Sequence, residues 1–147
     1  MNNRRVVVTG MGAVTALGLD TESTWTGVVN GRNGVKAIEH FDASAFSTRF
    51  SASLENFSTE GYLEPRDAKR MDLFIQYGMV AGIQAMRDSG LEITEANQDR
   101  VGCNVGAGIG GIGLIEKTSL LMNKSGPRKI SPFFVPGSII NMVAGNL

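Results

Sequence analysis

Two glycine-rich segments have the residue types and the spacing of loops that bind dinucleotides. The stronger one, G-x-G-x-x-G at residues 106–111, follows a predicted strand and begins a predicted helix, where it would place a pyrophosphate at the helix N-terminus. The acidic residue that binds the ribose about 20 residues later is missing, since no Asp or Glu follows Glu116. The segment at residues 10–15 ends in Thr instead of the third glycine. Of three interpretations of these segments, we favour glycine turns that close packing requires. Loops that line a non-nucleotide substrate site come second, and a nucleotide-binding site comes last.

The only cysteine and the only histidine, Cys103 and His40, are candidates for nucleophilic catalysis. Such a cysteine needs an adjacent base, and these two residues fall in different predicted elements, a strand and a polar loop. We expect Cys103 to be a small buried hydrophobic residue and His40 to be a surface or capping residue. One cysteine forms no internal disulfide, which is typical of the cytoplasm. We expect no metal and no cofactor.

Three basic residues, Arg66, Lys69 and Arg70, are spaced i, i+3 and i+4 in a predicted helix and would share one face. Cations near a helix N-terminus oppose the macrodipole, by roughly 0.3–1 kcal/mol each, so their presence indicates an anionic partner. The alternative is a solvated face that Asp67 and Asp72 neutralise.

The elements that would position these residues alternate between strand and helix, which predicts the α/β class. Strands are predicted at residues 4–9 and 101–105, and helices at residues 21–30, 65–89, about 113–122 and 138–147. Residues 31–62 are predicted to form a long irregular excursion from the alternating pattern, with short strands at most. Residues 132–136 are predicted to be extended. Asp20 or Thr21 is the expected N-cap of the first helix, with Gly31 just past its end.

The longest predicted helix has one apolar face and one thin side. Its apolar residues recur at i, i+3 and i+4, and Gly90 occupies the position of a C′ glycine. Gly78 and Gly82 each cost about 1 kcal/mol relative to alanine inside a helix. We therefore expect a neighbouring helix or strand to pack unusually close to them.

Composition excludes several classes of protein. Hydrophobic residues are 42% and charged residues 19% of the chain, which is typical of a globular protein. No apolar stretch reaches the roughly 18 residues of a membrane helix, and the N-terminus lacks a signal-peptide core, so we expect no membrane association and a cytoplasmic location. The net charge is zero and aromatic residues are not interleaved with the cations, which argues against nucleic acid.

Six segments together resemble the β-ketoacyl-[acyl-carrier-protein] synthases, condensing enzymes of the thiolase fold, and in particular the synthase II branch. These segments are Arg4–Gly12, Lys69–Asp72, Phe74–Tyr77, Ala107–Gly111, Gly126–Pro136 and Asn141–Gly145. The similarity extends over essentially the whole chain, and Gly126–Pro136 is its most specific part.

The resemblance implies a five-layered α/β/α/β/α fold built from two related halves, of which residues 1–147 would be an incomplete N-terminal half. It also implies a cysteine that acyl carrier protein acylates, and two histidines that assist decarboxylation of malonyl-carrier protein and condensation in type II fatty-acid synthesis. The resemblance places all three of these Cys-His-His residues beyond residue 147 and implies that this segment is inactive alone.

The resemblance also assigns roles to residues of this chain. Ile109 would lie against the growing acyl chain, and Phe134 would reach across a homodimer to line the partner subunit's pocket; the alternative for both is ordinary core packing. The carrier-protein docking surface would comprise Arg66, Lys69, Arg70, Arg128 and Lys129.

The predicted helix at 138–147 is apolar nearly all round. Because such a helix has no solvent face, we expect further chain or a second subunit to cover it. Residues 132–147 together offer a large apolar surface suited to a homodimer. Two other interpretations remain: an NAD(P)-binding α/β domain, and a non-catalytic partner subunit of a split enzyme.

Overall fold

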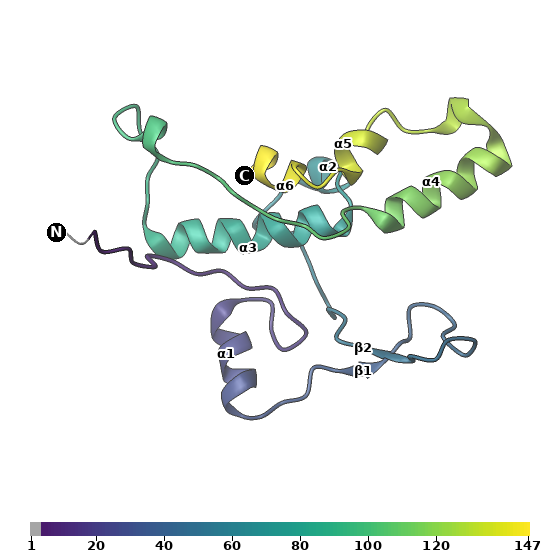
Figure 1. Cartoon of the computed structure of the whole chain (residues 1–147), viewed down its shortest axis with the longest axis horizontal. Helices are drawn as coiled ribbons and strands as arrows, with labels where there is room; N and C mark the ends of the chain where they lie inside the picture. The colour runs from purple at the N-terminus through teal and green to yellow at the C-terminus, as the bar shows by residue number, and fades with distance from the viewer. Residues whose placement is uncertain (1–3) are drawn as a thin grey trace. The chain divides into compact units, whose positions relative to one another are not determined.

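The computed structural model describes residues 4–147, which form two compact units. Unit 1 comprises the residues up to Ser58 together with Gln84–Gly90, and unit 2 comprises Thr59–Ile83 and Leu91–Leu147. The helices are α1 (Thr21–Val29), α2 (Pro65–Ala68), α3 (Leu73–Ser89), α4 (Ile112–Ser125), α5 (Phe134–Ser138) and α6 (Met142–Asn146), with 3-10 turns η1 (Gln98–Arg100) and η2 (Pro127–Lys129) (Figure 1). In this part of the chain, none of the helices combines the length and the apolar character needed to cross a bilayer.

In unit 1, helix α1 begins where the sequence predicts and ends one residue earlier, at Val29. The Asp20 side chain accepts a hydrogen bond from the Ser23 backbone N–H at 2.7 Å, which caps the helix. Hydrogen bonds from the Ser23 hydroxyl and then from its backbone hold the pKa of Asp20 below its ordinary value. Gly31 follows the helix with φ +62°, the left-handed conformation that glycine adopts most readily.

The excursion after α1 contains only short strands, as predicted. Strands β1 (Lys36–Ala37) and β2 (Phe50–Ser51) pair antiparallel, with Lys36 opposite Ser51. An ion pair of 2.7 Å between Lys36 and Glu55 ties β1 to the chain beyond β2.

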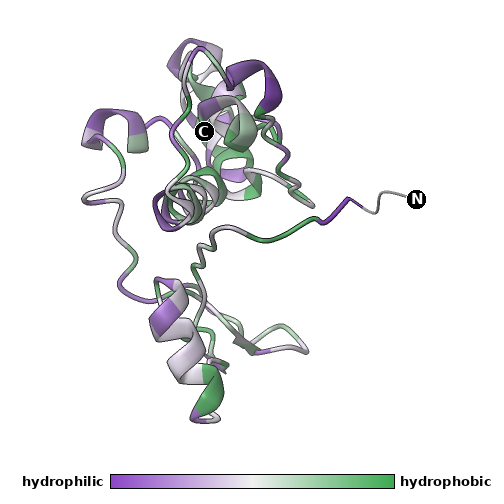
Figure 2. Cartoon of the chain, turned by 90° about the vertical axis from the view of Figure 1, so that its left-hand side faces the viewer, coloured by the Kyte–Doolittle hydropathy of each residue, from purple (hydrophilic) through white to green (hydrophobic). Residues whose placement is uncertain are grey.

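The two longer strands predicted at residues 4–9 and 101–105 are not formed. Val6, Val7 and Val8 are exposed, and this hydrophobic run has no strand beside it (Figure 2). The β-branched residues favour an extended chain, but a central strand also needs neighbours for its N–H and C=O groups. Within residues 4–147 neither segment pairs with another strand.

The helix predicted at residues 65–89 has the correct ends but is interrupted. Helix α2 stops at Ala68, the chain turns, and α3 starts at Leu73. The Gln76 side-chain amide donates to the carbonyl oxygens of Ala68 and Met71, at 2.9 and 3.0 Å, which satisfies two acceptors at the interruption. Asp72, at the start of α3, is a residue type that favours a helix beginning.

The core of unit 2 contains the buried side chains of Ile75, Met79 and Val143, from α3 and α6. A Cβ atom on Gly78 would lie 2.5 Å from Val143 Cγ1, and one on Gly82 would lie 2.6 Å from Leu147 Cδ1. The prediction of an unusually close neighbour for the glycine side of this helix is therefore confirmed, and the neighbour is α6.

The C-terminal segment differs from its prediction. Residues 132–136, predicted extended, include the start of α5, and the helix predicted at 138–147 is only α6. Ser131 explains the early helix, because its hydroxyl oxygen accepts from Phe133 N–H at 3.1 Å and its carbonyl oxygen accepts from Phe134 N–H at 3.0 Å. The apolar residues of this segment differ in exposure, since Val143 is buried and Ile140 is exposed.

Candidate functional site

The starts of α3 and α4 and the end of α5 meet at one residue, Asp72. Its Oδ1 accepts a hydrogen bond from the Phe74 backbone N–H at 3.3 Å, in the first turn of α3. Its Oδ2 accepts from the Leu114 backbone N–H at 2.9 Å, in the first turn of α4. The backbone N–H of Asp72 donates to the Gly137 carbonyl oxygen in α5 at 3.1 Å. One residue therefore connects three segments of unit 2.

The second glycine segment is packed tightly at its C-terminal end. The Gly111 N–H donates to the Ser138 carbonyl oxygen at 2.9 Å, and a Cβ on Gly111 would lie 2.8 Å from Ser138 Cα. Gly110 has φ +79°, and a Cβ there would lie 2.8 Å from the same carbonyl oxygen. At these two positions glycine is required because two backbone segments approach closely, as we predicted for glycine turns.

The N-terminal end of the same segment is open. A Cβ on Gly106 or Gly108 would meet no atom of the described residues within 4 Å. Ile109, between the open and the packed halves, is 72% exposed. Ile109 therefore takes no part in the core that residues 4–147 form.

The geometry argues against a pyrophosphate at the start of α4. Three N–H groups there already have acceptors: Gly111 donates to Ser138, Ile112 to Gly110 and Leu114 to Asp72. The Asp72 carboxylate also occupies the position where a phosphate would bind, and its negative charge would repel one.

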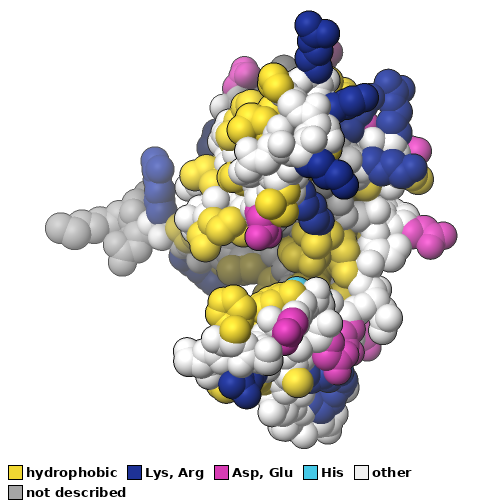
Figure 3. Space-filling model, turned by 90° about the vertical axis from the view of Figure 1, so that its right-hand side faces the viewer, with side chains coloured by type: hydrophobic (Ala, Val, Ile, Leu, Met, Phe, Trp, Pro, Cys, Tyr) yellow, Lys and Arg dark blue, Asp and Glu magenta, His cyan; other side chains and the backbone are white. Residues whose placement is uncertain are grey.

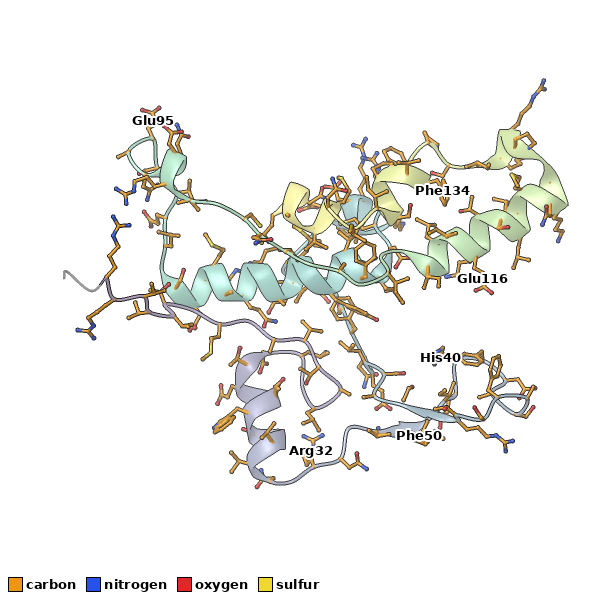
Figure 4. All side chains as sticks on the ribbon, in the orientation of Figure 1. Arg32, His40, Phe50, Glu95, Glu116 and Phe134 are labelled. Atoms are coloured by element: carbon orange, nitrogen blue, oxygen red, sulfur yellow. The ribbon has the colours of Figure 1, made fainter. Side chains whose placement is uncertain are left out.

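Phe134 and two of the predicted docking cations line one hollow of about 160 Å³. Phe134 begins α5 (Figure 4), and Lys69 and Arg70 come from the turn after α2. The Arg70 guanidinium carbon lies 4.2 Å from the centre of the Phe133 ring, a cation–π contact that fixes its position. Ile109 is not among the residues that line this hollow.

The structure corrects the basic face predicted at residues 66–70. Arg66 lies in the four-residue α2, Lys69 follows its end, and Arg70 lies in the turn, so no continuous helix presents all three. Arg70 is 3.7 Å from Asp67 and partly buried, whereas Arg66 and Lys69 are exposed. Of the two predicted neutralising acids, Asp67 forms this ion pair and Asp72 forms none within the described residues.

Arg128 and Lys129 lie on a separate element, η2, at the C-terminal end of α4. Gly126, with φ +80°, makes the turn between α4 and η2. Both cations are exposed, and Figure 3 shows Lys and Arg side chains gathered over the face on which α4 and η2 lie. The five predicted cations therefore come from two segments of the chain, which we treat as two groups, residues 66–70 and residues 128–129.

Cys103 is exposed, so the prediction of a buried cysteine is wrong. Burial was expected from its predicted strand, and that strand is not formed. His40 is exposed, as predicted, and its ring packs edge-on against Phe41 with centres 4.9 Å apart. In residues 4–147, no three His, Cys, Asp or Glu side chains are grouped so as to hold a metal ion.

Sequence reasoning missed the part that Asp72 plays. The signal for one of its bonds was present, since Asp before an apolar helix is a typical N-cap. The other bond, to Leu114, spans 42 residues and has no local signal. Asp72 also affects Tyr77, whose pKa is raised first by burial and then by the negative charge of this carboxylate.

Comparison with known proteins gives one consistent result. Residues 3–147 match the family model described as "Beta-ketoacyl synthase, N-terminal domain". The chain is 56% identical over 147 residues to the 3-oxoacyl-[acyl-carrier-protein] synthase 2 of Vibrio harveyi, and 53% identical to that of Vibrio cholerae serotype O1. All of this chain is covered, but only 35% and 36% of those relatives, so the chain spans about a third of their length.

A solved structure of a type II polyketide ketosynthase, in complex with its acyl-carrier protein, has a similar fold. The TM-score is 0.78 at 26% identity, and the match covers 99% of this chain and 38% of the ketosynthase chain. This similarity confirms the predicted fold class, although the two longer predicted strands are not formed here.

Proposed function

Because the chain belongs to the β-ketoacyl synthase family, whose N-terminal domain it matches, we propose that it is part of a synthase II that elongates acyl chains in type II fatty-acid synthesis. The observation that supports this best is 56% identity to a 3-oxoacyl-[acyl-carrier-protein] synthase 2 across the whole chain. In the proposed reaction, malonyl-carrier protein loses carbon dioxide, and the resulting carbanion attacks the thioester carbonyl of an acylated cysteine. The products are 3-oxoacyl-carrier protein and the free thiol.

We propose that residues 1–147 contribute binding surfaces, and that the cysteine and the two histidines lie outside them. The chain has one histidine, His40. Within the described residues, Cys103 forms no hydrogen bond with a basic side chain. The chain alone is then an incomplete thiolase-like half without activity. The complete protein is proposed to be a cytoplasmic homodimer.

The acyl pocket is proposed to include Ile109 and Phe134. The exposure of Ile109 supports a role in contacting something outside the core of unit 2. Phe134 is half-buried in a hollow beside Lys69 and Arg70, which supports a place between pocket and docking surface.

Docking of acyl carrier protein, an acidic partner, is proposed to use the two groups of cations. Arg66 and Lys69 are exposed and form no ion pair within the described residues, so both are available to an anionic partner. Arg70 contributes a positioned charge, because Phe133 holds its guanidinium group in place. Arg128 and Lys129 form the second group.

The experiment compares the full-length protein with residues 1–147 in a condensation assay that contains acyl-carrier protein and malonyl-carrier protein. We expect 3-oxoacyl-carrier protein and carbon dioxide from the full-length protein and neither from the shorter chain. No product from the full-length protein, or saturable NAD(P) binding by it, would overturn the proposal.

The docking surface is tested separately by carrier-protein binding. Replacing Arg66 and Lys69 by Ala is expected to weaken binding and to reduce its dependence on salt, since two exposed charges are removed. Arg32→Ala, an exposed cation of unit 1, is the matched control. Unchanged affinity and unchanged salt dependence in the double variant would contradict docking at this group.

A further inference from the structure

Helix α4 is capped by a side chain from outside it. Its own N-cap residue is Gly111, which has no side chain to accept a hydrogen bond from the first turn. Asp72, 42 residues earlier in the chain, accepts from Leu114 N–H instead. The N–H groups of a helix start need such acceptors, so α4 depends on a residue that also begins α3.

The two oxygens of Asp72 have separate partners. Oδ1 bonds to α3 and Oδ2 bonds to α4, so the carboxylate fixes the distance and direction between the two helix starts. A side chain with a single acceptor oxygen can satisfy only one of the two helices.

The position of Ile109 depends on this connection. On its C-terminal side, Gly110 and Gly111 pack against Ser138 and lead directly into α4. On its N-terminal side, Gly108 has no neighbour within 4 Å of a Cβ position. On that side the support is Val105, which packs against the core of unit 2 four residues away. Ile109 is therefore held most directly from its C-terminal side, through the turn that Asp72 joins to α3.

We propose that Asp72 is a positioning residue that sets the acyl-chain-length preference of the enzyme by holding the turn that carries Ile109. This inference rests on the proposed function, in which Ile109 contacts the acyl chain. According to this inference, Asp72 does not touch the substrate and acts only through the start of α4.

The experiment measures kcat/KM of the full-length protein for a short and a long acyl-carrier protein, and compares the long-to-short ratio between variants. Asp72→Asn keeps the size and one acceptor oxygen but presents an NH₂ group to one of the two helices. We expect it to change the ratio by about fivefold, the effect of losing one cap interaction of ordinary strength.

Two further variants separate positioning from general stability. Asp20→Asn makes the same chemical change at the cap of α1, in unit 1, and is expected to leave the ratio unchanged. In an Ile109→Ala background, Asp72→Asn is expected to have no further effect on the ratio, because Asp72 acts through Ile109.

If Asp72→Asn does not fold, Asp72→Ser replaces it, since serine caps α3 but its single hydroxyl cannot also bond to α4. A folded variant with the wild-type ratio overturns the inference while the proposed function stands. So does an effect of Asp72→Asn that persists undiminished without Ile109. Absence of condensation by the wild-type protein overturns the proposed function itself.

Discussion

The two glycine turns of this chain look alike in sequence but are supported differently. In unit 1, the turn at residues 10–18 is held along its length by side chains of α3: Gln84 Oε1 accepts from Ala13 N–H at 3.1 Å, and Asp88 Oδ2 accepts from Met11 N–H at 2.8 Å. In unit 2, the turn at residues 106–111 packs closely only at Gly110 and Gly111, and Val105 before it packs against the core.

The difference shows what a glycine pattern alone cannot distinguish. A Cβ on Gly10 would collide with backbone atoms of Ala85 and Ser89, so this glycine is required for packing. Gly108 meets nothing comparable, and the exposed Ile109 follows it. The first turn packs closely against α3, whereas the second turn leaves one apolar side chain, that of Ile109, outside the core.

The largest expected effect follows from this contrast. Gly10→Ala places a methyl group against the Ala85 carbonyl oxygen and the Ser89 N–H, neither of which can move without bending α3. We expect the free energy of unfolding to fall by about 3 kcal/mol. Urea denaturation measures it.

Gly108→Ala is the matched change in the second turn. With no atom within 4 Å of the new methyl group and no positive φ, it is expected to cost less than about 0.5 kcal/mol. Equal costs for Gly10→Ala and Gly108→Ala would contradict the difference between the two turns.

The next effect compares the carboxylates beside the two turns. Asp20 caps one helix, α1, and Asp72 caps two, α3 and α4. We expect Asp20→Ala to lower the free energy of unfolding by roughly 1 kcal/mol and Asp72→Ala by roughly 2 kcal/mol. Denaturation at neutral pH tests this, and an Asp72 cost no larger than that of Asp20 would mean that one of its two bonds adds nothing.

A smaller effect concerns pH. Because the pKa of Asp20 lies below its ordinary value of 3.8 in the folded chain, its ionised form stabilises the fold above pH 3.8. This contribution is lost as the pH falls through the folded pKa. The difference in unfolding free energy between wild type and Asp20→Asn should therefore narrow in acid. A difference that is constant from pH 7 to pH 2 would show that the cap does not depend on the charge.

Local features of the fold were predictable from sequence, and features that need distant partners were not. The limits of α1 and the C-terminal end of α3 were predicted to within one residue because Asp20, Gly31 and Gly90 act within one turn of the helix. The break after α2 was missed, since the residues from Arg66 to Asp72 fit helical spacing and only the bonds of Gln76 reveal the interruption. The strand predictions failed because β-branched residues indicate an extended chain and do not supply a neighbouring strand.

In the candidate site, too, the features that depend on local sequence were predictable and those that depend on distant contacts were not. Arg66 was proposed from the helical spacing of three cations, and Ile109 from the family resemblance. Neither argument needs knowledge of contacts. Lys69 and Phe134 line one hollow and Arg128 does not, and this arrangement follows from the path of the chain through α4, η2 and α5. Asp72 entered the sequence analysis only in the alternative, as a neutralising surface charge, because its second partner, Leu114, lies 42 residues away.

The smallest effect tests the charge of Asp72 beside the second turn. Burial is the main cause of the raised pKa of Tyr77, and the charge of Asp72 is the second. Asp72→Asn removes the charge and keeps the burial, so the pKa should fall only part of the way towards 10.0. Alkaline titration of phenolate absorbance measures this in a Tyr62→Phe background, where Tyr77 is the one tyrosine left.

The sign of the accompanying change in stability follows from the same shift. A raised pKa means that neutral Tyr77 stabilises the fold below pH 10.0, and that this contribution is lost as the pH rises through the folded pKa. The alkaline loss should be smaller in Asp72→Asn, and unchanged in the control Asp67→Asn. If Asp67→Asn shifts the titration as much as Asp72→Asn does, the charge near Tyr77 is a general property of the acidic residues around α2 and not of the carboxylate that joins α3 to α4.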